Sequence, residues 1–482
     1  MLFNSIDFAI FLPIVFFIYW LLSKYNYKIQ NFFIVIASYI FYGWWDYRFL
    51  SLLFFSSITD FSIGLLLKNE ERLNRRKLYL MISIFVNIGL LGFFKYFNFF
   101  VDNLVQAFTF FGYHLNPLNL KIILPVGISF YTFQTLSYSL DVFRKKLNPT
   151  DDLIAFLAYV SFFPQLVAGP IERACNLLPQ FYKKREFNYS ESVEGLKQML
   201  WGFFKKLVVA DNSAKIVDAV FSNLSSYSGS SIFIASIAFA FQIYGDFSGY
   251  SDIAIGTAKL MGFNLMNNFL YPYFSRDIAE FWRRWHISLT TWFRDYIYIP
   301  LGGSRVSLSK SIINTFIIFL VSGFWHGASW TFLLWGLLNA IYFMPLLILG
   351  KNKKNKNIIA ENKKFPTIKE LLGSIVTFIF VSFSWIFFRS NNLLNLKICL
   401  SKIFSRSLFK YPGIIKITDF KLTFSMIFFM LFFEYLSRNT NYGLAFTNKL
   451  PRFCRYLLYF IIIFCIGMSM QAAKTEFIYF QF

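Results

Sequence analysis

Residues 271–330 read YPYFSRDIAEFWRRWHISLTTWFRDYIYIPLGGSRVSLSKSIINTFIIFLVSGFWHGASW, in which polar motifs stand beside apolar runs. The chain has only three histidines, and two of them, His286 and His326, lie here, each directly after a tryptophan. Apolar runs over Ser311–Phe324 and Ala328–Leu349 flank His326. Ionisable side chains are costly inside an apolar protein, so their presence indicates chemistry more often than packing. We therefore predict an active site in this stretch.

The composition predicts the fold class. Of the 482 residues, 56% are hydrophobic and 15% are charged, against about 25% charged in soluble proteins. Long apolar runs recur along the chain, which predicts an all-α, polytopic membrane protein in a lipid bilayer and excludes a β-barrel of short alternating strands. The net charge of +22 comes from Lys and Arg clustered in short loops. Such loops are typical of orientation signals and headgroup contacts, so we expect no nucleic-acid partner.

The loops after the first apolar runs alternate in charge. Basic loops follow the first and third runs, whereas the second loop is neutral and residues 98–120 contain no Lys or Arg. The positive-inside rule then places the N-terminus outside the cytoplasm. Residues 1–20 lack a basic start and a small-residue cleavage site, so we expect a retained helix and no removed signal peptide. The first four predicted spans are Ile6–Ser23, Asn31–Trp45, Phe49–Leu67 and Leu78–Phe97.

Proline and glycine interrupt the next apolar runs. The fifth span, Leu120–Leu140, contains Pro125 and Gly127, which predict a kinked or broken helix. Short apolar pieces with internal Pro or charge fill Leu153–Asn212, and we expect re-entrant or interfacial helices that line a cavity on the cytoplasmic side. A span over Ser231–Tyr244 is followed by Gly245–Asp252, where small residues predict a break.

The remaining chain contains a basic segment and further spans. Lys351–Lys364 is predicted to be a soluble cytoplasmic linker, whereas Arg389–Lys421 is basic yet falls on the outer side by alternation. Either the span count is wrong there or that loop lies on the surface as amphipathic helices. We predict one membrane-embedded domain with N-terminal helices (1–150), a catalytic core (151–350), the linker (351–370) and C-terminal helices (371–482). The last predicted spans are Leu372–Phe388, Leu422–Leu436 and Tyr456–Met470.

The two histidines are candidate catalytic residues. Imidazole is the natural general base near neutral pH, and apolar surroundings keep it unprotonated. The alternative is a core histidine that is hydrogen-bonded to a neighbouring helix. Glycines on both sides of the Phe324-Trp325-His326 segment allow close approach of a substrate, which favours the functional interpretation. His114 lies in a predicted extramembrane loop and is interpreted as incidental.

Charged residues near His286 are candidate binding groups. The arginines could hold an anionic group such as coenzyme phosphates, or they could anchor helices at the headgroups. The nearby carboxylates are expected to form ion pairs with them, because isolated charges would be too costly. No Cys pair or His/Cys spacing predicts a disulfide or a metal site, and no P-loop, dinucleotide or Ser-hydrolase motif occurs. The arginines are Arg276, Arg283, Arg284, Arg294 and Arg305; the carboxylates are Asp246, Asp252, Glu280 and Asp295.

Taken together, the motifs resemble the membrane-bound O-acyltransferase family, and specifically its bacterial alginate O-acetyltransferase branch. The resemblance covers nearly the whole chain. It implies that His326 is the family's catalytic histidine and that His286 occupies the second active-site position. The motifs that carry it are residues 124–134 (LPVGISFYTFQ), 163–165 (FPQ), 168–171 (AGPI), 245–252 (GDFSGYSD), 281–289 (FWRRWHISL), 323–327 (GFWHG) and 476–482 (EFIYFQF).

The resemblance implies about eleven spans around a funnel and no bound cofactor. It also implies that acetyl passes from cytoplasmic acetyl-CoA outward, across the bacterial inner membrane, to a single-span or extracytoplasmic partner that acetylates a glycan. The acceptor could be alginate, peptidoglycan or another envelope glycan. The alternatives are a D-alanine transferase of the same superfamily, or a transporter of a lipid-linked sugar. Candidate substrate-binding residues in and near these motifs are Arg276, Arg283, Arg284, Arg305, Asp295, Trp285, Trp325 and Gln134.

Overall fold

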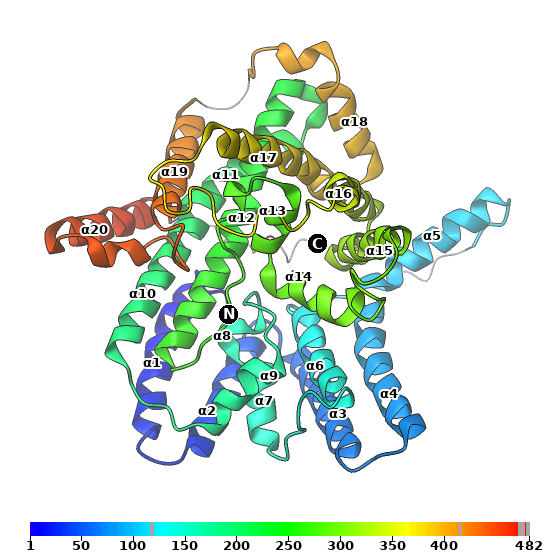
Figure 1. The fold of residues 1–482 in the computed structure, drawn as a ribbon, viewed down its shortest axis with the longest axis vertical. Coiled ribbons are helices and arrows are strands. Elements are labelled where there is room, and N and C mark those ends of the chain that lie inside the picture. Colours follow the sequence, from blue (N-terminus) through cyan, green and yellow to red (C-terminus); the bar gives the residue numbers. More distant parts are fainter. Residues whose placement is uncertain (116–119, 414–416, 471–477, 479–482) are drawn as a thin grey trace. The chain divides into compact units, whose positions relative to one another are not determined.

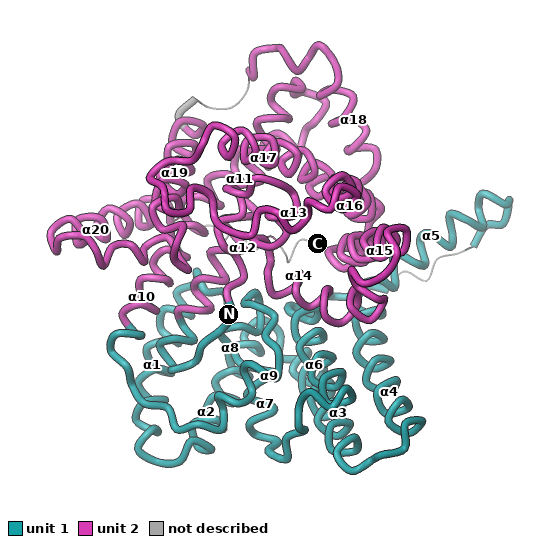
Figure 2. The backbone as a smooth tube through the Cα atoms, in the orientation of Figure 1, with its two compact units in different colours: residues 1–192, 257–266 teal, residues 193–256, 267–482 magenta. Residues whose placement is uncertain are grey.

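The computed structural model describes residues 1–115, 120–413, 417–470 and 478, and over these residues the secondary structure is helical, with no strand (Figure 1). The chain divides into two compact units (Figure 2). Unit 1 comprises Met1–Ser192 with Thr257–Met266, and unit 2 comprises Val193–Gly256 with Asn267–Phe482. The terminal motif over residues 476–482 lies outside the described residues, apart from Ile478.

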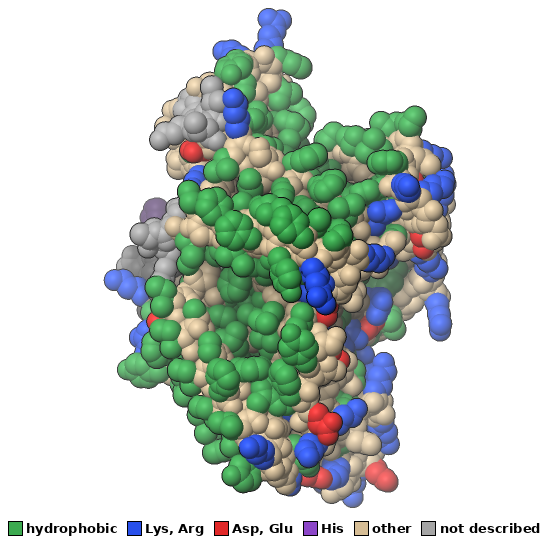
Figure 3. Space-filling model, turned by 90° about the vertical axis from the view of Figure 1, so that its left-hand side faces the viewer, with side chains coloured by type: hydrophobic (Ala, Val, Ile, Leu, Met, Phe, Trp, Pro, Cys, Tyr) green, Lys and Arg blue, Asp and Glu red, His purple; other side chains and the backbone are tan. Residues whose placement is uncertain are grey.

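The described helices confirm a polytopic membrane protein. Seven of them are long and apolar enough to cross a bilayer, and two shorter apolar helices cover Ile6–Leu22 and Leu153–Leu166. Exposed hydrophobic side chains cover much of the face drawn in Figure 3, as expected for a protein surrounded by lipid. The total of eleven spans, the funnel, and the four-part division of the chain stay predictions. The seven are Tyr47–Lys68, Leu73–Phe110, Gly229–Leu260, Leu308–His326, Trp330–Ile348, Ile368–Arg389 and Arg452–Ser469.

Unit 1 is held together by polar contacts between apolar helices. The carboxylate of Asp60 on α3 is fully buried and accepts hydrogen bonds from Ser83 (2.5 Å) and Asn87 (2.7 Å) on α4 and from Ser139 (2.5 Å) on α6. These contacts fix the register of three helices whose apolar surfaces alone would let them slide. The helices of this unit are α1 (Ile6–Leu22), α2 (Tyr27–Gly43), α3 (Leu50–Lys68), α4 (Leu73–Leu91), α5 (Phe97–Phe110), α6 (Ile128–Phe143), α7 (Leu153–Ser161), α8 (Phe163–Leu166) and α9 (Ala174–Leu177).

The structure tests two helix boundaries that the sequence predicts in unit 1. The predicted interruption at Gly127 is confirmed, because α6 begins only at Ile128 and Gly127 has a φ of 75°. A Cβ atom there would lie 2.7 Å from the carbonyl oxygen of Leu166, so both backbone shape and space require glycine. The prediction of a loop directly after Phe97 is wrong. The helix continues through a π turn at Gly92–Tyr96 into α5, because no proline or glycine interrupts Phe97–Phe110.

Unit 2 contains His286 and His326. Its longest helix is α12 (Gly229–Leu260), of which Gly229–Gly256 belong to this unit. The predicted break at 245–252 is wrong, since α12 is continuous there. Its glycines allow close packing instead. Cβ atoms at Gly245 and Gly249 would lie 2.8 Å from the carbonyl oxygen of Lys205 and 2.7 Å from that of Gly202. Small residues four apart commonly let helices approach closely in membranes.

The other helices of unit 2 precede and follow α12 in the chain. Just after α10, Phe204–Ala210 forms a π-helical segment. α15 and α16 form a hairpin in which Gly323 and Gly336 face backbone carbonyls across the contact. In the basic loop Arg389–Lys421, α18 buries Leu396, Cys399 and Ile403 on one face, as an amphipathic helix would. The helices are α10 (Tyr189–Phe203), α11 (Asp211–Phe221), α13 (Ile278–Arg284), α14 (Ile287–Phe293), α15 (Leu308–His326), α16 (Trp330–Ile348), α17 (Ile368–Arg389), α18 (Leu393–Ile403), α19 (Ile417–Leu436) and α20 (Arg452–Ser469).

Candidate active site

His326 is the last residue of α15 and sits among aromatic rings. Only 5% of its surface is exposed. The centres of the Trp325, Trp335 and Phe388 rings lie 4.8, 5.1 and 5.1 Å from the centre of its imidazole. These rings fix the plane of the imidazole by packing, because α15, α16 and α17 each contribute one of them.

His286 occupies the junction between α13 and α14. Its backbone is left-handed (φ 44°, ψ 54°), which is uncommon for a residue with a Cβ atom and turns the chain sharply before α14 begins. The side chain is 2% exposed, and its ring packs edge-on against Phe247, 4.6 Å away between ring centres. A strained backbone at a buried polar residue is frequent at functional sites.

The two histidines line one pocket, although forty positions separate them in the chain. The pocket has about 450 Å³ of empty space, open solvent at its mouth included. Trp325 lies beside both rings, 6.0 Å from His286 and 4.8 Å from His326. Among the described residues that line the pocket there is no Asp, Glu, Lys or Arg. They are Trp282, Trp285, His286, Leu289, Thr290, Phe293, Ile318, Phe319, Ser322 and His326.

Burial determines the charge of His286. Removal from water disfavours the imidazolium form and lowers the pKa of His286 from 6.5 to about 3. Nδ1 of His286 lies 3.0 Å from Oδ1 of Asn268. His286 is therefore neutral at physiological pH. A general base works best when its pKa lies near the operating pH, so the low pKa of His286 makes it the weaker of the two histidines for that role.

The arginines on α13 do not line the pocket. Glu280 pairs with Arg276 (3.0 Å) and with Arg284 (2.9 Å), which confirms the ion pairs predicted for this carboxylate. Arg283 donates instead to the backbone carbonyls of Asn352 (2.8 Å) and Asn355 (2.6 Å). The predicted linker, Lys351–Lys364, therefore contacts α13 through these two carbonyls.

Four other predicted groups are not among the described residues that line the pocket. Asp295 pairs with Arg294 at 2.6 Å, as expected, and Arg305 is exposed. Gln134 belongs to unit 1, where it donates to the carbonyl of Tyr159 at 2.6 Å. His114 lies in an exposed segment.

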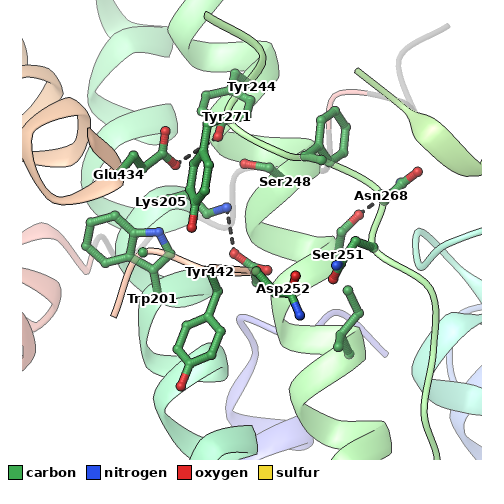
Figure 4. A pocket seen from close by; sticks show the side chains of 15 residues that line it. Trp201, Lys205, Tyr244, Ser248, Ser251, Asp252, Asn268, Tyr271, Glu434 and Tyr442 are labelled. Atoms are coloured by element: carbon green, nitrogen blue, oxygen red, sulfur yellow. Dashed lines mark hydrogen bonds and ion pairs between the residues drawn. The ribbon is translucent and has the colours of Figure 1, made fainter. Parts of the chain in front are cut away.

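Two aspartates pair with lysines, so their predicted pairing with arginine is wrong. Asp246 contacts Lys206 at 2.7 Å, and Asp252 contacts Lys205 at 2.6 Å. α12 turns both carboxylates toward the π-helical segment that carries the lysines, which sequence spacing did not reveal. Glu434 lines the same polar pocket as Lys205 and Asp252, and it accepts a hydrogen bond from Tyr244 at 2.8 Å (Figure 4).

The polar pocket of Figure 4 is linked to His286. Asn268 and Ser251 both line it, and Asn268 donates to the Ser251 hydroxyl at 3.1 Å. The sequence analysis did not identify Asn268, Trp282 or Ser288 as site residues. A buried asparagine eighteen residues before a histidine has no recognisable spacing, because only the turn between α12 and α13 brings the two together.

Comparison with known proteins identifies the family of the chain. Residues 36–354 match the model of the membrane-bound O-acyltransferase (MBOAT) family. The chain is 39% identical over 396 residues to the probable alginate O-acetylase of Pseudomonas aeruginosa, with 82% of this chain and 73% of the relative covered. It is 36% identical to the peptidoglycan O-acetyltransferase of Helicobacter pylori (82% and 78% covered) and 28% identical to the teichoic acid D-alanyltransferase of Bacillus subtilis (57% and 70% covered). The chain is thus a multi-pass membrane O-acyltransferase, and it belongs to the membrane-bound O-acyltransferase family, in the branch that includes bacterial alginate O-acetylases.

Proposed function

We propose that this enzyme moves an acetyl group from cytoplasmic acetyl-CoA across the bacterial inner membrane for O-acetylation of a cell-surface polysaccharide. The observation that carries the proposal is the pocket shared by His286 and His326. A single-span or extracytoplasmic partner places the group on the glycan, which is alginate, peptidoglycan or a similar polymer. The relatives named for acetylation of the first two polymers support this choice.

The proposed chemistry is general-base acyl transfer. The acceptor hydroxyl oxygen attacks the thioester carbonyl while His326 takes the hydroxyl proton. The carbon–sulfur bond then breaks, and the proton passes from His326 to the departing thiolate. His286 supports the base or steadies the negative charge that develops on the carbonyl oxygen.

The pocket lining favours acetyl over D-alanyl. A D-alanyl group carries an ammonium, which would need a carboxylate or a water-filled site when removed from solvent. The described lining offers aromatic and aliphatic side chains with two hydroxyls and the two imidazoles, and no carboxylate. A small neutral acyl group suits these surroundings better.

Among the arginines, Arg283 is the one we assign to the phosphates of the donor. Arg276 and Arg284 form ion pairs with Glu280, whereas Arg283 donates to two neutral backbone carbonyls that phosphate oxygens could replace. Arg276, Arg284 and Arg305 then act at the edge of the donor site. Trp285, which lines the pocket, and Trp325, which packs beside both histidines, are assigned to shaping the substrate path.

The test is acetyl transfer by purified protein in proteoliposomes with radiolabelled acetyl-CoA. His326→Asn keeps a hydrogen-bonding side chain but removes the base, so activity should fall by about two to four orders of magnitude. His114→Gln, a change at the exposed histidine, is the matched control and should keep full activity. A His326→Asn protein that melts like the parent and keeps more than about a tenth of its activity would refute the mechanism.

A further inference from the structure

Asn268 contacts His286 in a geometry that determines which ring nitrogen carries the proton. The asparagine is 1% exposed and precedes α13, in the segment that connects it with α12. Its backbone carbonyl accepts a hydrogen bond from the amide of Ile287 at 2.9 Å. This bond ties the asparagine to the residue directly after His286, so the two side chains are held beside each other.

The amide orientation of Asn268 follows from its other partners. Its Oδ1 accepts from the backbone N–H of Ser288 at 3.4 Å, and a backbone N–H can only donate. The Ser288 hydroxyl also contacts Oδ1, at 2.9 Å, while Nδ2 donates to the Ser251 hydroxyl at 3.1 Å. The atom that faces His286 Nδ1 is therefore an oxygen, which can only accept.

We infer that Asn268 is a positioning residue that holds His286 in the Nδ1–H tautomer and leaves Nε2 as the basic nitrogen of the ring. An unprotonated Nε2 has no N–H to donate to an oxyanion, so of the two roles proposed for His286 this tautomer favours support of the base. Since Oδ1 accepts, Nδ1 must carry the proton at the observed 3.0 Å separation. The partner of one ring nitrogen commonly sets the role of the other in this way. This inference rests on the proposed function only for its effect on acyl transfer, because the tautomer is a property of the resting protein.

Ser251 is the outer support of this arrangement. It lies on α12 and lines the polar pocket of Figure 4 together with Asn268. Its hydroxyl accepts from Nδ2, and a 180° rotation of the amide would turn Nδ2 toward the backbone N–H of Ser288 and lose that hydrogen bond. The hydrogen bonds from Ser251 through Asn268 to His286 thus connect the polar pocket to the pocket that His286 and His326 line.

The direct test is nitrogen-15 NMR of imidazole-labelled protein in detergent, in which three histidines give few signals. His114→Gln and His326→Asn assign the spectrum by loss of a signal. We expect the His286 signals of the parent to show a protonated Nδ1 and an unprotonated Nε2. In Asn268→Leu, which is similar in size and cannot accept, the Nε2–H tautomer should appear. A parent spectrum with Nε2–H as the main form would overturn the inference, whatever the protein's activity.

Kinetics separate positioning from general structural support. In Asn268→Leu we expect kcat to fall by about 10- to 100-fold, the range found when the partner of a metal-bound histidine is removed, with KM little changed. Asn268→Asp keeps an acceptor oxygen toward Nδ1 and should preserve the tautomer and recover most of kcat, and it also serves if the leucine variant fails to fold. Ser251→Ala, the matched control, should reduce kcat less than Asn268→Leu. Equal losses in Asn268→Leu and Asn268→Asp, with an unchanged tautomer in both, would contradict the inference. If the NMR result holds and no acetyl transfer is found, the proposed function fails and the positioning role stands.

Discussion

The buried ion pair between Lys205 and Asp252 allows a quantitative test of the packing around α12. The two side chains are 4% and 11% exposed, and their charged atoms lie 2.6 Å apart. Asp252 also accepts a hydrogen bond from Gln198 at 2.8 Å. The Lys205 ammonium lies over the Tyr244 ring at 5.5 Å, and Glu434 lines the same pocket.

Lys205→Met should destabilise the protein strongly. It removes the cation and leaves two carboxylates, Asp252 and Glu434, in one buried pocket. Loss of one partner of a buried pair costs about 3 to 5 kcal/mol, and the second carboxylate places this variant at the upper end. Asp252→Asn should cost less, because Lys205 keeps Glu434 as a neighbouring anion. We expect an asymmetry of at least about 1 kcal/mol between the two variants, the net contribution of one typical hydrogen bond.

The double variant completes the cycle. Lys205→Met with Asp252→Asn removes both charges of the pair, so it should be more stable than the sum of the single changes predicts, by about 1 to 3 kcal/mol. The measurement is SDS-induced unfolding in mixed micelles, with thermal melts as a second readout. Lys68→Met, which removes the cation of an exposed ion pair with Asp151 (side chains 41% and 65% exposed), is the control and should cost less than about 1 kcal/mol. Additive single effects, or a Lys205→Met variant within about 1 kcal/mol of the parent, would refute the assignment of this pair as buried and coupled.

Three further predictions concern the site, the fold and the topology. The pKa of His286 in the folded protein, about 3, lies below the 6.5 of an exposed histidine, so the unfolded chain binds a proton that the folded chain does not as pH falls below about 6.5. The unfolding free energy of the parent should therefore drop by about 2 kcal/mol between pH 7.5 and pH 5 relative to His286→Asn, and identical pH dependence in both proteins would contradict it. Gly249→Leu should impair folding, because its Cβ would lie 2.7 Å from the carbonyl oxygen of Gly202, whereas Gly467→Leu on α20, with no atom within 4 Å of its Cβ, should melt like the parent. In a variant without the four native cysteines, new cysteines at Asn4 and at the exposed Tyr113 should react with an impermeant reagent from outside the cell, and one at Lys353 should not. Labelling of Lys353 in intact cells would reverse the orientation derived from loop charge.

Sequence alone was sufficient for the fold class and for the two catalytic candidates. Apolar runs such as Ala328–Leu349 predict membrane helices, because a bilayer requires each crossing segment to satisfy its own backbone and to present apolar side chains. His286 and His326 stood out because imidazole is rare and costly among such residues. The Pro125-Val126-Gly127 motif also predicted the interruption before Ile128 correctly, because this interruption arises from local backbone chemistry.

Only the tertiary structure decided which groups meet. In the sequence, Gly245 and Gly249 suggest a break in the helix. In the structure, they let another backbone pack against a continuous α12. Asp252 was expected to pair with arginine but pairs with Lys205, because helix rotation sets its direction. Asn268 reaches His286 through a turn that no periodicity encodes. Residue type and local pattern determined where chemistry was possible, and the packing of helices, whose contacts depend on distance in space and not along the chain, selected the partners.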